Sequence, residues 1–179
     1  MSEPTLLVAD DHPLFRAALI QVLHDRFPQF RIVEAASAQT LGAAMQDHPE
    51  IELVLLDLAM PGARGFSSLL HLRGEYAQVP VIIISSNDDP RIIRRAQQFG
   101  AAGFISKSAA ADDMSAAIDD VLSGDISFPS MVAERSEADA ALAARLAQLT
   151  PQQFRVLLCI ADGLLNKQIA HELGLAENT

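Results

Sequence analysis

The fold of this chain is decided by the stretch Leu53-Val54-Leu55-Leu56-Asp57-Leu58-Ala59-Met60-Pro61-Gly62-Ala63-Arg64-Gly65. Its four leading apolar residues predict a strand that is buried on both faces, which is typical of a parallel sheet covered by helices. The strand cannot continue through Met60-Pro61-Gly62, because proline has no N–H to give to a sheet ladder. Asp57 is therefore expected at the C-terminal end of a buried strand, where open α/β sheets bind their ligands. We interpret it as a nucleophile.

Five short apolar runs alternate with amphipathic segments over residues 1–123. The expected strands are 6–9, 32–35, 53–56, 81–84 and 103–105, and the expected helices are 13–27, 39–47, 66–74, 91–99 and 112–122. Strands that alternate with helices of this length need right-handed crossovers and form a parallel sheet between two helical layers. The predicted fold class is therefore α/β, with a doubly wound five-stranded parallel sheet.

The remaining chain predicts two further parts. Residues 124–148 contain an Ala-rich, charged stretch, and we expect a linker that is partly helical. Residues 149–179 begin with Thr150-Pro151-Gln152-Gln153, an N-cap followed by proline at the first helical position. Two short helices joined by a turn then predict an all-α helix-turn-helix that is incomplete, because a third helix would only be starting at Thr179.

Charge and hydropathy narrow the classes of function. The 179 residues are 50% hydrophobic, with a formal net charge of -10 and a pI near 4.8. This balance argues against a chain that wraps nucleic acid through its overall charge. The apolar runs of about five residues are far shorter than a membrane span. We expect a cytoplasmic protein that makes no membrane contact.

Polar side chains stand at the ends of four predicted strands. They are Asp10 and Asp11, Asp57, Ser85 and Ser86, and Ser106 and Lys107. Because the C-terminal ends of parallel strands meet at one edge of a sheet, we expect these side chains to share a crevice. Crowded carboxylates need a cation, and oxygen ligands without a Cys/His cluster favour Mg²⁺ over zinc. Mg²⁺ and Lys107 would supply positive charge for a phosphoryl group, which Asp57 could accept as an acyl phosphate.

Each of these residues also has a plainer interpretation when it is taken alone. An aspartate at a strand end is most often a turn or cap residue, and a lone lysine usually faces solvent. Their joint occurrence at the strand ends favours a site. The five histidines form no pair at ligand spacing, so we interpret each as a surface or capping residue: His12, His24, His48, His71 and His171. Arg91, Arg94 and Arg95 are interpreted as the solvated face of a helix.

Residues 1 to about 123 resemble the receiver domain of bacterial response regulators. The resemblance rests on Asp10-Asp11, on Asp57-Leu58-Ala59-Met60-Pro61-Gly62, on Ser85 after Val81-Ile82-Ile83-Ile84, and on Lys107 after Gly100-Ala101-Ala102-Gly103-Phe104. It implies a flavodoxin-like fold and the phosphorylation of Asp57 by a sensor histidine kinase.

The same resemblance implies roles for individual residues. Asp11, Asp57 and the backbone carbonyl of Ala59 would hold Mg²⁺, with help from Asp10. Lys107 would pair with the phosphate, Ser85 would turn inward to hydrogen-bond it, and Phe104 would follow as an aromatic switch.

Residues 149–179 are similar to the first half of the LuxR-type helix-turn-helix, which with this receiver indicates the NarL/FixJ group. Base readout needs a helix in the major groove. The candidate DNA contacts within the chain are Asn166, Lys167 and Thr179. DNA binding is expected only if the helix-turn-helix is completed beyond Thr179.

We therefore predict a phosphorylation-controlled switch rather than a metabolic enzyme. The regulator would catalyse its own phosphoryl transfer and hydrolysis, and phosphorylation would drive homodimerisation and, in a full-length form, transcription control. One alternative is a truncated or phosphate-independent receiver that acts through protein contacts, which a DNA-binding assay would separate from a transcription factor. Another is an Asp-nucleophile phosphatase, which would need an acid where Ala59 stands and would show sustained turnover.

Overall fold

The computed structural model describes residues 3–129 and, beyond them, residues 145, 148–150, 153, 156, 157, 160 and 169. Strands and helices alternate through the continuous part. In chain order they are β1 (Thr5–Ala9), α1 (Pro13–Arg26), β2 (Arg31–Ala35), α2 (Ala38–Asp47), β3 (Ile51–Asp57), α3 (Ser67–Glu75), β4 (Val81–Ser85), α4 (Pro90–Gln98), β5 (Gly103–Ser106) and α5 (Ala111–Leu122). The predicted elements are confirmed, with bounds that shift by one or two residues.

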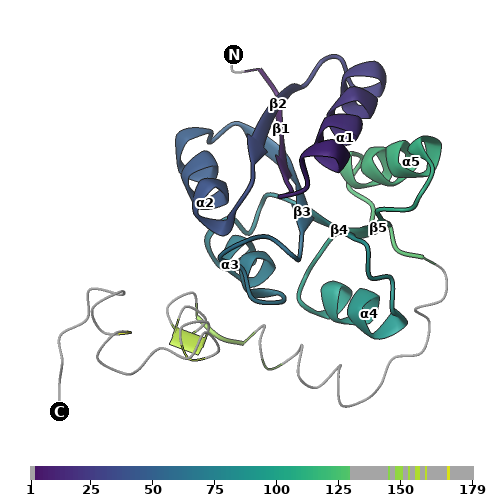
Figure 1. Ribbon diagram of the computed structural model, residues 1–179. Helices are drawn as coiled ribbons and strands as arrows, with labels where there is room; N and C mark the ends of the chain where they lie inside the picture. Colours follow the sequence, from purple (N-terminus) through teal and green to yellow (C-terminus); the bar gives the residue numbers. More distant parts are fainter. Residues whose placement is uncertain are drawn as a thin grey trace, which may run out of the picture.

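The five strands form one parallel sheet in the order β2-β1-β3-β4-β5. Figure 1 shows this sheet between two groups of helices, with α1 and α5 on one side and α2, α3 and α4 on the other. The predicted doubly wound α/β fold is therefore confirmed. The strand order reverses direction at β1, because the chain moves from β1 outward to β2 and then crosses back to β3.

Two apolar cores cover the two faces of the sheet. Alternate residues of a strand point to opposite faces, so Leu6 and Val8 of β1 join the core under α1 and α5, while Leu7 and Ala9 join the core under α2, α3 and α4. Burial on both faces explains why these strands are continuous apolar runs.

The chain beyond α5 returns to the free edge of β5. Ser127 forms a parallel bridge with Gly103, and its carbonyl oxygen accepts a hydrogen bond of 2.9 Å from the N–H of Phe104. A Cβ atom on Gly103 would lie 2.9 Å from that carbonyl oxygen, so this close approach requires glycine. The sequence pattern did not predict this extra pairing.

The described residues of the C-terminal part confirm one local prediction. The N–H of Thr150 donates to Gln153 Oε1 over 2.9 Å, and the N–H of Gln153 donates to Thr150 Oγ1 over 3.3 Å. This reciprocal pair is a capping box. Most of the expected linker helix lies outside the described residues, although residue 145 within it is helical. The candidate DNA contacts Asn166, Lys167 and Thr179 all lie outside the described residues. Within the described part of the chain, no helix is both long and apolar enough to cross a membrane.

Candidate functional site

The strand order brings two aspartates together at the C-terminal edge of the sheet. Asp10 directly follows β1 and Asp57 is the last residue of β3. These strands are neighbours, with Ala9 paired to Leu56, so the next residue of each strand lies beside the other. This edge, at the point where the strand order reverses, is where open α/β sheets bind ligands.

The carboxylates of Asp10 and Asp57 are almost completely buried. Their side chains are 3% and 1% exposed. One oxygen of each is satisfied by a backbone donor nearby in sequence: the N–H of His12 donates to Asp10 Oδ1 over 2.7 Å, and the N–H of Ala59 donates to Asp57 Oδ1 over 3.0 Å. Buried carboxylates need such donors and a cation, because burial removes the water that would otherwise stabilise their charge.

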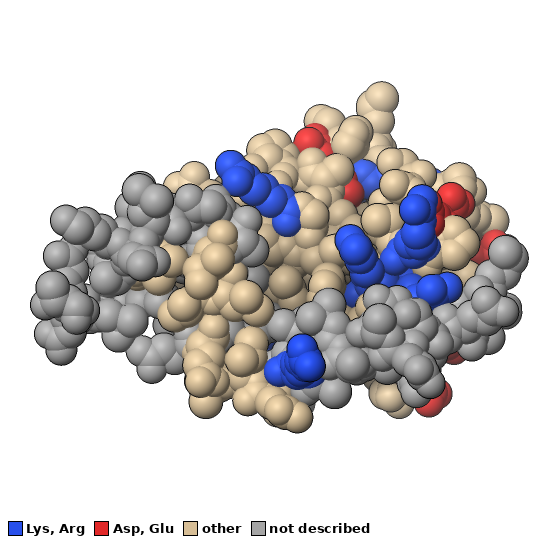
Figure 2. Space-filling view, turned by 90° about the horizontal axis from the view of Figure 1, so that it is seen from below, with Lys and Arg blue, Asp and Glu red and all other residues tan. Residues whose placement is uncertain are grey.

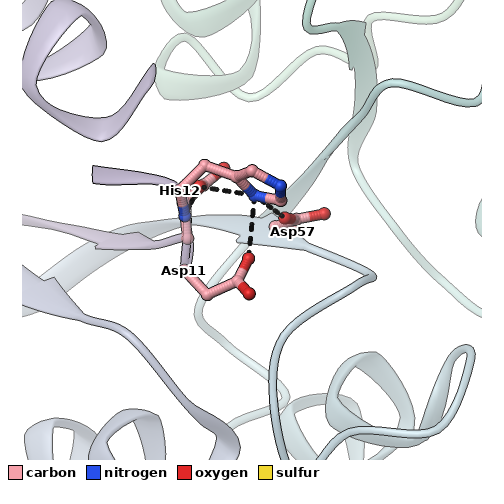
Figure 3. Close-up of side chains that lie close together, drawn as sticks. Asp11, His12 and Asp57 are labelled. Carbon is pink, nitrogen blue, oxygen red and sulfur yellow. Dashed lines mark hydrogen bonds and ion pairs between the residues drawn. The ribbon is translucent and has the colours of Figure 1, made fainter. Parts of the chain in front are cut away.

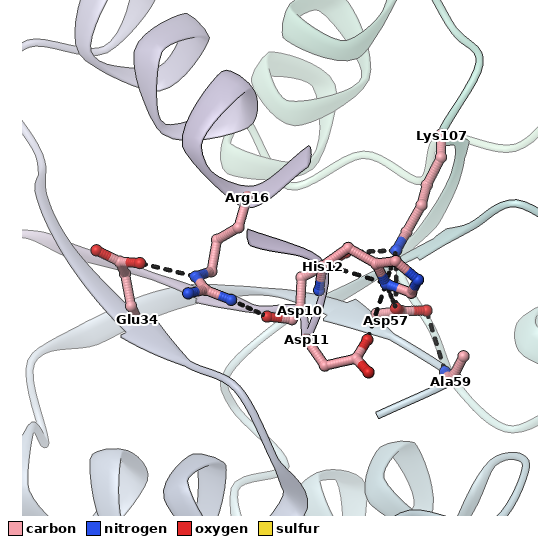
Figure 4. A network of polar contacts seen from close by, with 8 residues as sticks. All are labelled: Asp10, Asp11, His12, Arg16, Glu34, Asp57, Ala59 and Lys107. Carbon is pink, nitrogen blue, oxygen red and sulfur yellow. Dashed lines mark hydrogen bonds and ion pairs between the residues drawn. The ribbon is translucent and has the colours of Figure 1, made fainter. Parts of the chain in front are cut away.

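Lys107 supplies positive charge to both buried aspartates. It follows β5, and its Nζ lies 2.6 Å from Asp10 Oδ2 and donates to Asp57 Oδ2 over 2.8 Å (Figure 4). Burial opposes the charged form of Lys107, but its contacts with the two carboxylates outweigh this effect, and the pKa of Lys107 is raised above its ordinary value. The ammonium also lies 4.9 Å from the centre of the Phe15 ring.

His12 completes this cluster, a role that the sequence interpretation missed. It occupies the N-cap position of α1 but makes no side-chain cap hydrogen bond. Instead, its Nδ1 lies 2.8 Å from Asp11 Oδ1 and 3.6 Å from Asp57 Oδ2 (Figure 3). The sequence pattern favoured a surface or capping role for His12, although its position directly after Asp10-Asp11 indicates a place beside the site.

Arg16 is a second residue that sequence reasoning did not single out. Its Nη1 donates to the backbone oxygen of Asp10 over 2.6 Å, and its Nε donates to Glu34 Oε2 over 2.8 Å (Figure 4). Arg16 belongs to α1 and Glu34 to β2. The guanidinium therefore ties the loop after β1 to the neighbouring strand and holds the backbone that carries the aspartates.

Ser85 is the last residue of β4, at this edge, whereas Phe104 lies within β5. The buried Ser85 Oγ accepts a 3.1 Å hydrogen bond from the N–H of Asn87, and the Ser85 backbone oxygen accepts one of 2.8 Å from the N–H of Lys107. Phe104 is buried in the core under α2, α3 and α4. Their roles as hydroxyl donor and aromatic switch stay predictions.

The arginines of α4 lie on a basic side of the molecule. Arg91 and Arg95 are exposed and Arg94 is half-buried. Helix α4 lies at the lower edge of Figure 1, and the view from below in Figure 2 shows Lys and Arg side chains gathered on that side. Arg91 pairs with the helix N-cap Asp89 over 2.8 Å, and its hydrogen bonds lower the pKa of Asp89 to about 2. The solvated helix face is thus the observed environment of Arg91 and Arg95.

Comparison with known proteins agrees with this fold. A model of the response regulator receiver domain matches residues 6–119, and a model of the bacterial regulatory proteins of the luxR family matches residues 147–179. The chain is 38% identical to the glycerol metabolism activator of Pseudomonas putida, over 97% of this chain and 83% of that protein. It is 30% identical to the nitrate/nitrite response regulator protein NarL of Escherichia coli K12, over 98% of this chain and 83% of that protein.

A solved structure of a receiver domain has the same fold as the first part of this chain. The signal receiver domain of the putative response regulator NarL from Mycobacterium tuberculosis is 31% identical, with a TM-score of 0.60, and the match covers 69% of this chain and 99% of that one. The receiver match, the luxR match and these relatives lead to one conclusion. The chain belongs to the two-component response regulators, as a NarL-type transcription regulator with a receiver domain and a LuxR-type DNA-binding region.

Proposed function

We propose that Asp57 is the phosphoacceptor and that a sensor histidine kinase supplies the phosphoryl group. One observation carries the proposal: Asp57 Oδ2 is held at 2.8 Å by Lys107, a residue 50 positions away in the chain, in a setting where the aspartate side chain is 1% exposed. A buried carboxylate aligned by a fixed ammonium is oriented for attack on an electrophilic phosphorus.

The chemistry requires little beyond positioning and charge neutralisation. An Asp57 carboxylate oxygen forms a bond to phosphorus while the bond between phosphorus and the kinase imidazole nitrogen breaks, and the imidazole leaves. Lys107 is placed to neutralise charge on the phosphoryl oxygens. Hydrolysis reverses the modification when water attacks phosphorus and releases inorganic phosphate. The transfer step uses Asp57 as the nucleophile and Lys107 to neutralise charge, which supports self-catalysed transfer. Hydrolysis needs only water in addition and restores the Asp57 carboxylate.

The donor set fits a hard divalent cation. The carboxylates of Asp10, Asp11 and Asp57 gather around one point. The ammonium of Lys107 pairs with Asp10 and Asp57, so the negative charge of the three carboxylates exceeds the positive charge there. Carboxylate oxygens suit Mg²⁺. Asp10, Asp11, Asp57 and the carbonyl of Ala59 would hold it. When bound, the ion would add positive charge beside the phosphoryl oxygens.

Phosphorylation would act as a switch through charge. The phosphoryl group adds up to two negative charges. Ser85 would exchange its hydrogen bond with Asn87 for one to the phosphoryl group, and Phe104 would repack with it. To shift the ratio of active to inactive conformations from 1:99 to 99:1, the phosphoryl group must favour the active conformation by about 5.5 kcal/mol. Charge-assisted hydrogen bonds contribute about 1.5–3 kcal/mol each, so a few of them would suffice.

The output follows from the domain order. In this proposal residues 1–123 form the receiver, residues 124–148 the linker, and residues 149–179 the LuxR-type DNA-binding region. Phosphorylation would promote homodimerisation, and a dimer would present two DNA-binding regions to the two halves of a site.

The test is phosphorylation by a small phosphodonor such as acetyl phosphate in the presence of Mg²⁺. Intact-mass spectrometry should show one added phosphoryl group on the wild type and none on Asp57→Asn. Asp47→Asn, at an exposed position at the end of α2, is the matched control and should be labelled like the wild type. Equal labelling of Asp57→Asn and wild type would refute the assignment. Gel filtration of the same samples tests the dimer, which should form only where Asp57 is labelled.

A further inference from the structure

The proposed phosphoryl chemistry leaves the imidazole of His12 without a role. Its side chain is 61% exposed, yet its Nδ1 points into the cluster of carboxylates, as Figure 3 shows. Nδ1 lies 2.8 Å from an oxygen of Asp11, 3.5 Å from one of Asp10 and 3.6 Å from one of Asp57. An exposed ring that only capped the helix or faced solvent would not approach three carboxylates.

These spacings are those of ligands around one metal ion. The four candidate ligand atoms, from Asp10, Asp11, His12 and Asp57, all lie within 4.8 Å of one another. Neighbouring ligands bonded at about 2.0–2.1 Å lie roughly 2.9 Å apart in an octahedron and roughly 3.4 Å apart in a tetrahedron. The distances from Nδ1 to oxygen lie close to these values, with the 2.8 Å distance just below the octahedral spacing and those of 3.5 and 3.6 Å just above the tetrahedral one.

The surroundings of Nδ1 leave a buried oxygen without a partner. Nδ1 lies 3.3 Å from Lys107 Nζ, and an ammonium can only donate, so Nδ1 is the acceptor there. Asp11 Oδ1 lies 2.8 Å from Nδ1, yet this oxygen is buried and has no hydrogen-bond partner among the described residues. A cation bound between Nδ1 and the Asp11 oxygen would satisfy that oxygen, because both atoms would present lone pairs to it.

We propose that His12 is a further protein ligand beside the three aspartates and the Ala59 carbonyl, which makes this a mixed oxygen–imidazole site with a preference for first-row transition ions. Oxygen ligands suit Mg²⁺, whereas an imidazole nitrogen favours Co²⁺, Ni²⁺ and Zn²⁺. His12 therefore determines metal selectivity, while the oxygen ligands from the aspartates and Ala59 suffice for Mg²⁺. The inference rests on the proposed function, because it shares Asp57 and the aspartate pair with the Mg²⁺ site.

The experiment measures metal affinity on the full chain by isothermal titration calorimetry, with Mg²⁺ and Ni²⁺ titrated separately into metal-free protein. The variants are His12→Asn and, as a matched control, His24→Asn, an exposed histidine in the last turn of the same helix. His12→Asn should weaken Ni²⁺ binding at the aspartate site at least about tenfold and leave the Mg²⁺ affinity within about twofold. His24→Asn should change neither. Retained Mg²⁺ binding also shows that the variant is folded.

A second measurement reads the ligand set directly. The visible absorption bands of bound Co²⁺ should shift when His12→Asn removes a nitrogen ligand, and should not shift in His24→Asn. Equal Ni²⁺ affinity and unchanged Co²⁺ bands in His12→Asn would overturn the inference and leave the proposed function intact. A wild type that binds no Mg²⁺ and accepts no phosphoryl group would instead refute the proposed function.

Discussion

Replacing Lys107 with methionine removes the ammonium from between two buried carboxylates and keeps a stem of similar length. In the native protein, Nζ lies 2.6 Å from Asp10 and 2.8 Å from Asp57, and the Lys107 side chain is 12% exposed. Breaking a buried ion pair by removing one partner typically lowers the free energy of unfolding by about 3–5 kcal/mol. Asp10 and Asp57 each keep one backbone N–H donor, so we expect a loss at the lower end of this range, about 3 kcal/mol.

Urea denaturation at neutral pH in EDTA, followed by far-ultraviolet circular dichroism, measures this loss. Arg95→Met, on the exposed face of α4, is the matched control and should change the free energy of unfolding by less than about 0.5 kcal/mol. Adding Asp57→Asn to Lys107→Met should recover part of the lost free energy of unfolding, because it removes one of the two buried carboxylate charges that are left unpaired. Mg²⁺ at a hundred times its dissociation constant should stabilise the variant by about 2.7 kcal/mol.

The pH dependence has a defined sign. The pKa of Lys107 in the folded protein is raised above its ordinary value of 10.5. The stabilisation by Lys107 is therefore fully present below 10.5 and is lost as pH rises through the raised folded value. The stability difference between wild type and Lys107→Met should stay constant around neutral pH and shrink only as the pH rises above 10.5. A loss below about 1 kcal/mol in EDTA, or no recovery with Asp57→Asn, would refute the reasoning.

Three further substitutions test other parts of the structure. Gly103→Ala places a Cβ 2.9 Å from the Ser127 oxygen and should lower the free energy of unfolding by about 1–3 kcal/mol; hydrogen exchange at the Phe104 amide should quicken, and unchanged protection would contradict the pairing. Arg16→Met releases the backbone of Asp10 and should weaken Mg²⁺ binding about tenfold by calorimetry, whereas an unchanged affinity would deny it a positioning role. Ser37→Ala removes the side-chain acceptor of the capping box at α2 and should lower stability by about 1 kcal/mol in urea denaturation, and no change would show that the cap is dispensable.

The sequence was sufficient to predict the elements of the receiver. Runs such as Leu53 to Leu56 are apolar without alternation because both faces of β3 are covered. Met60-Pro61-Gly62 stops the strand soon after Asp57, and the helices carry the spacing of one buried face. These features are local: they depend on which neighbours a residue has along the chain, so a pattern in the sequence can report them.

Which strands lie side by side is decided by the tertiary structure. The crossing from β2 past β1 to β3 places Asp57 beside Asp10, and only packing of the whole sheet sets that order. The sequence named the polar residues at the strand ends, but it did not show that Lys107 would reach both Asp10 and Asp57.

The contacts missed from the sequence share one physical cause. The inward turn of His12, the bond from Arg16 to Asp10, and the return of Ser127 to Gly103 all join segments whose meeting depends on side-chain direction and loop path. Neither is encoded in a hydrophobic period. The sequence by itself thus determined the α/β elements and the chemical character of the strand ends, because these depend on local residue pattern. The tertiary structure alone decided how those groups face one another, because long-range packing sets distance and orientation.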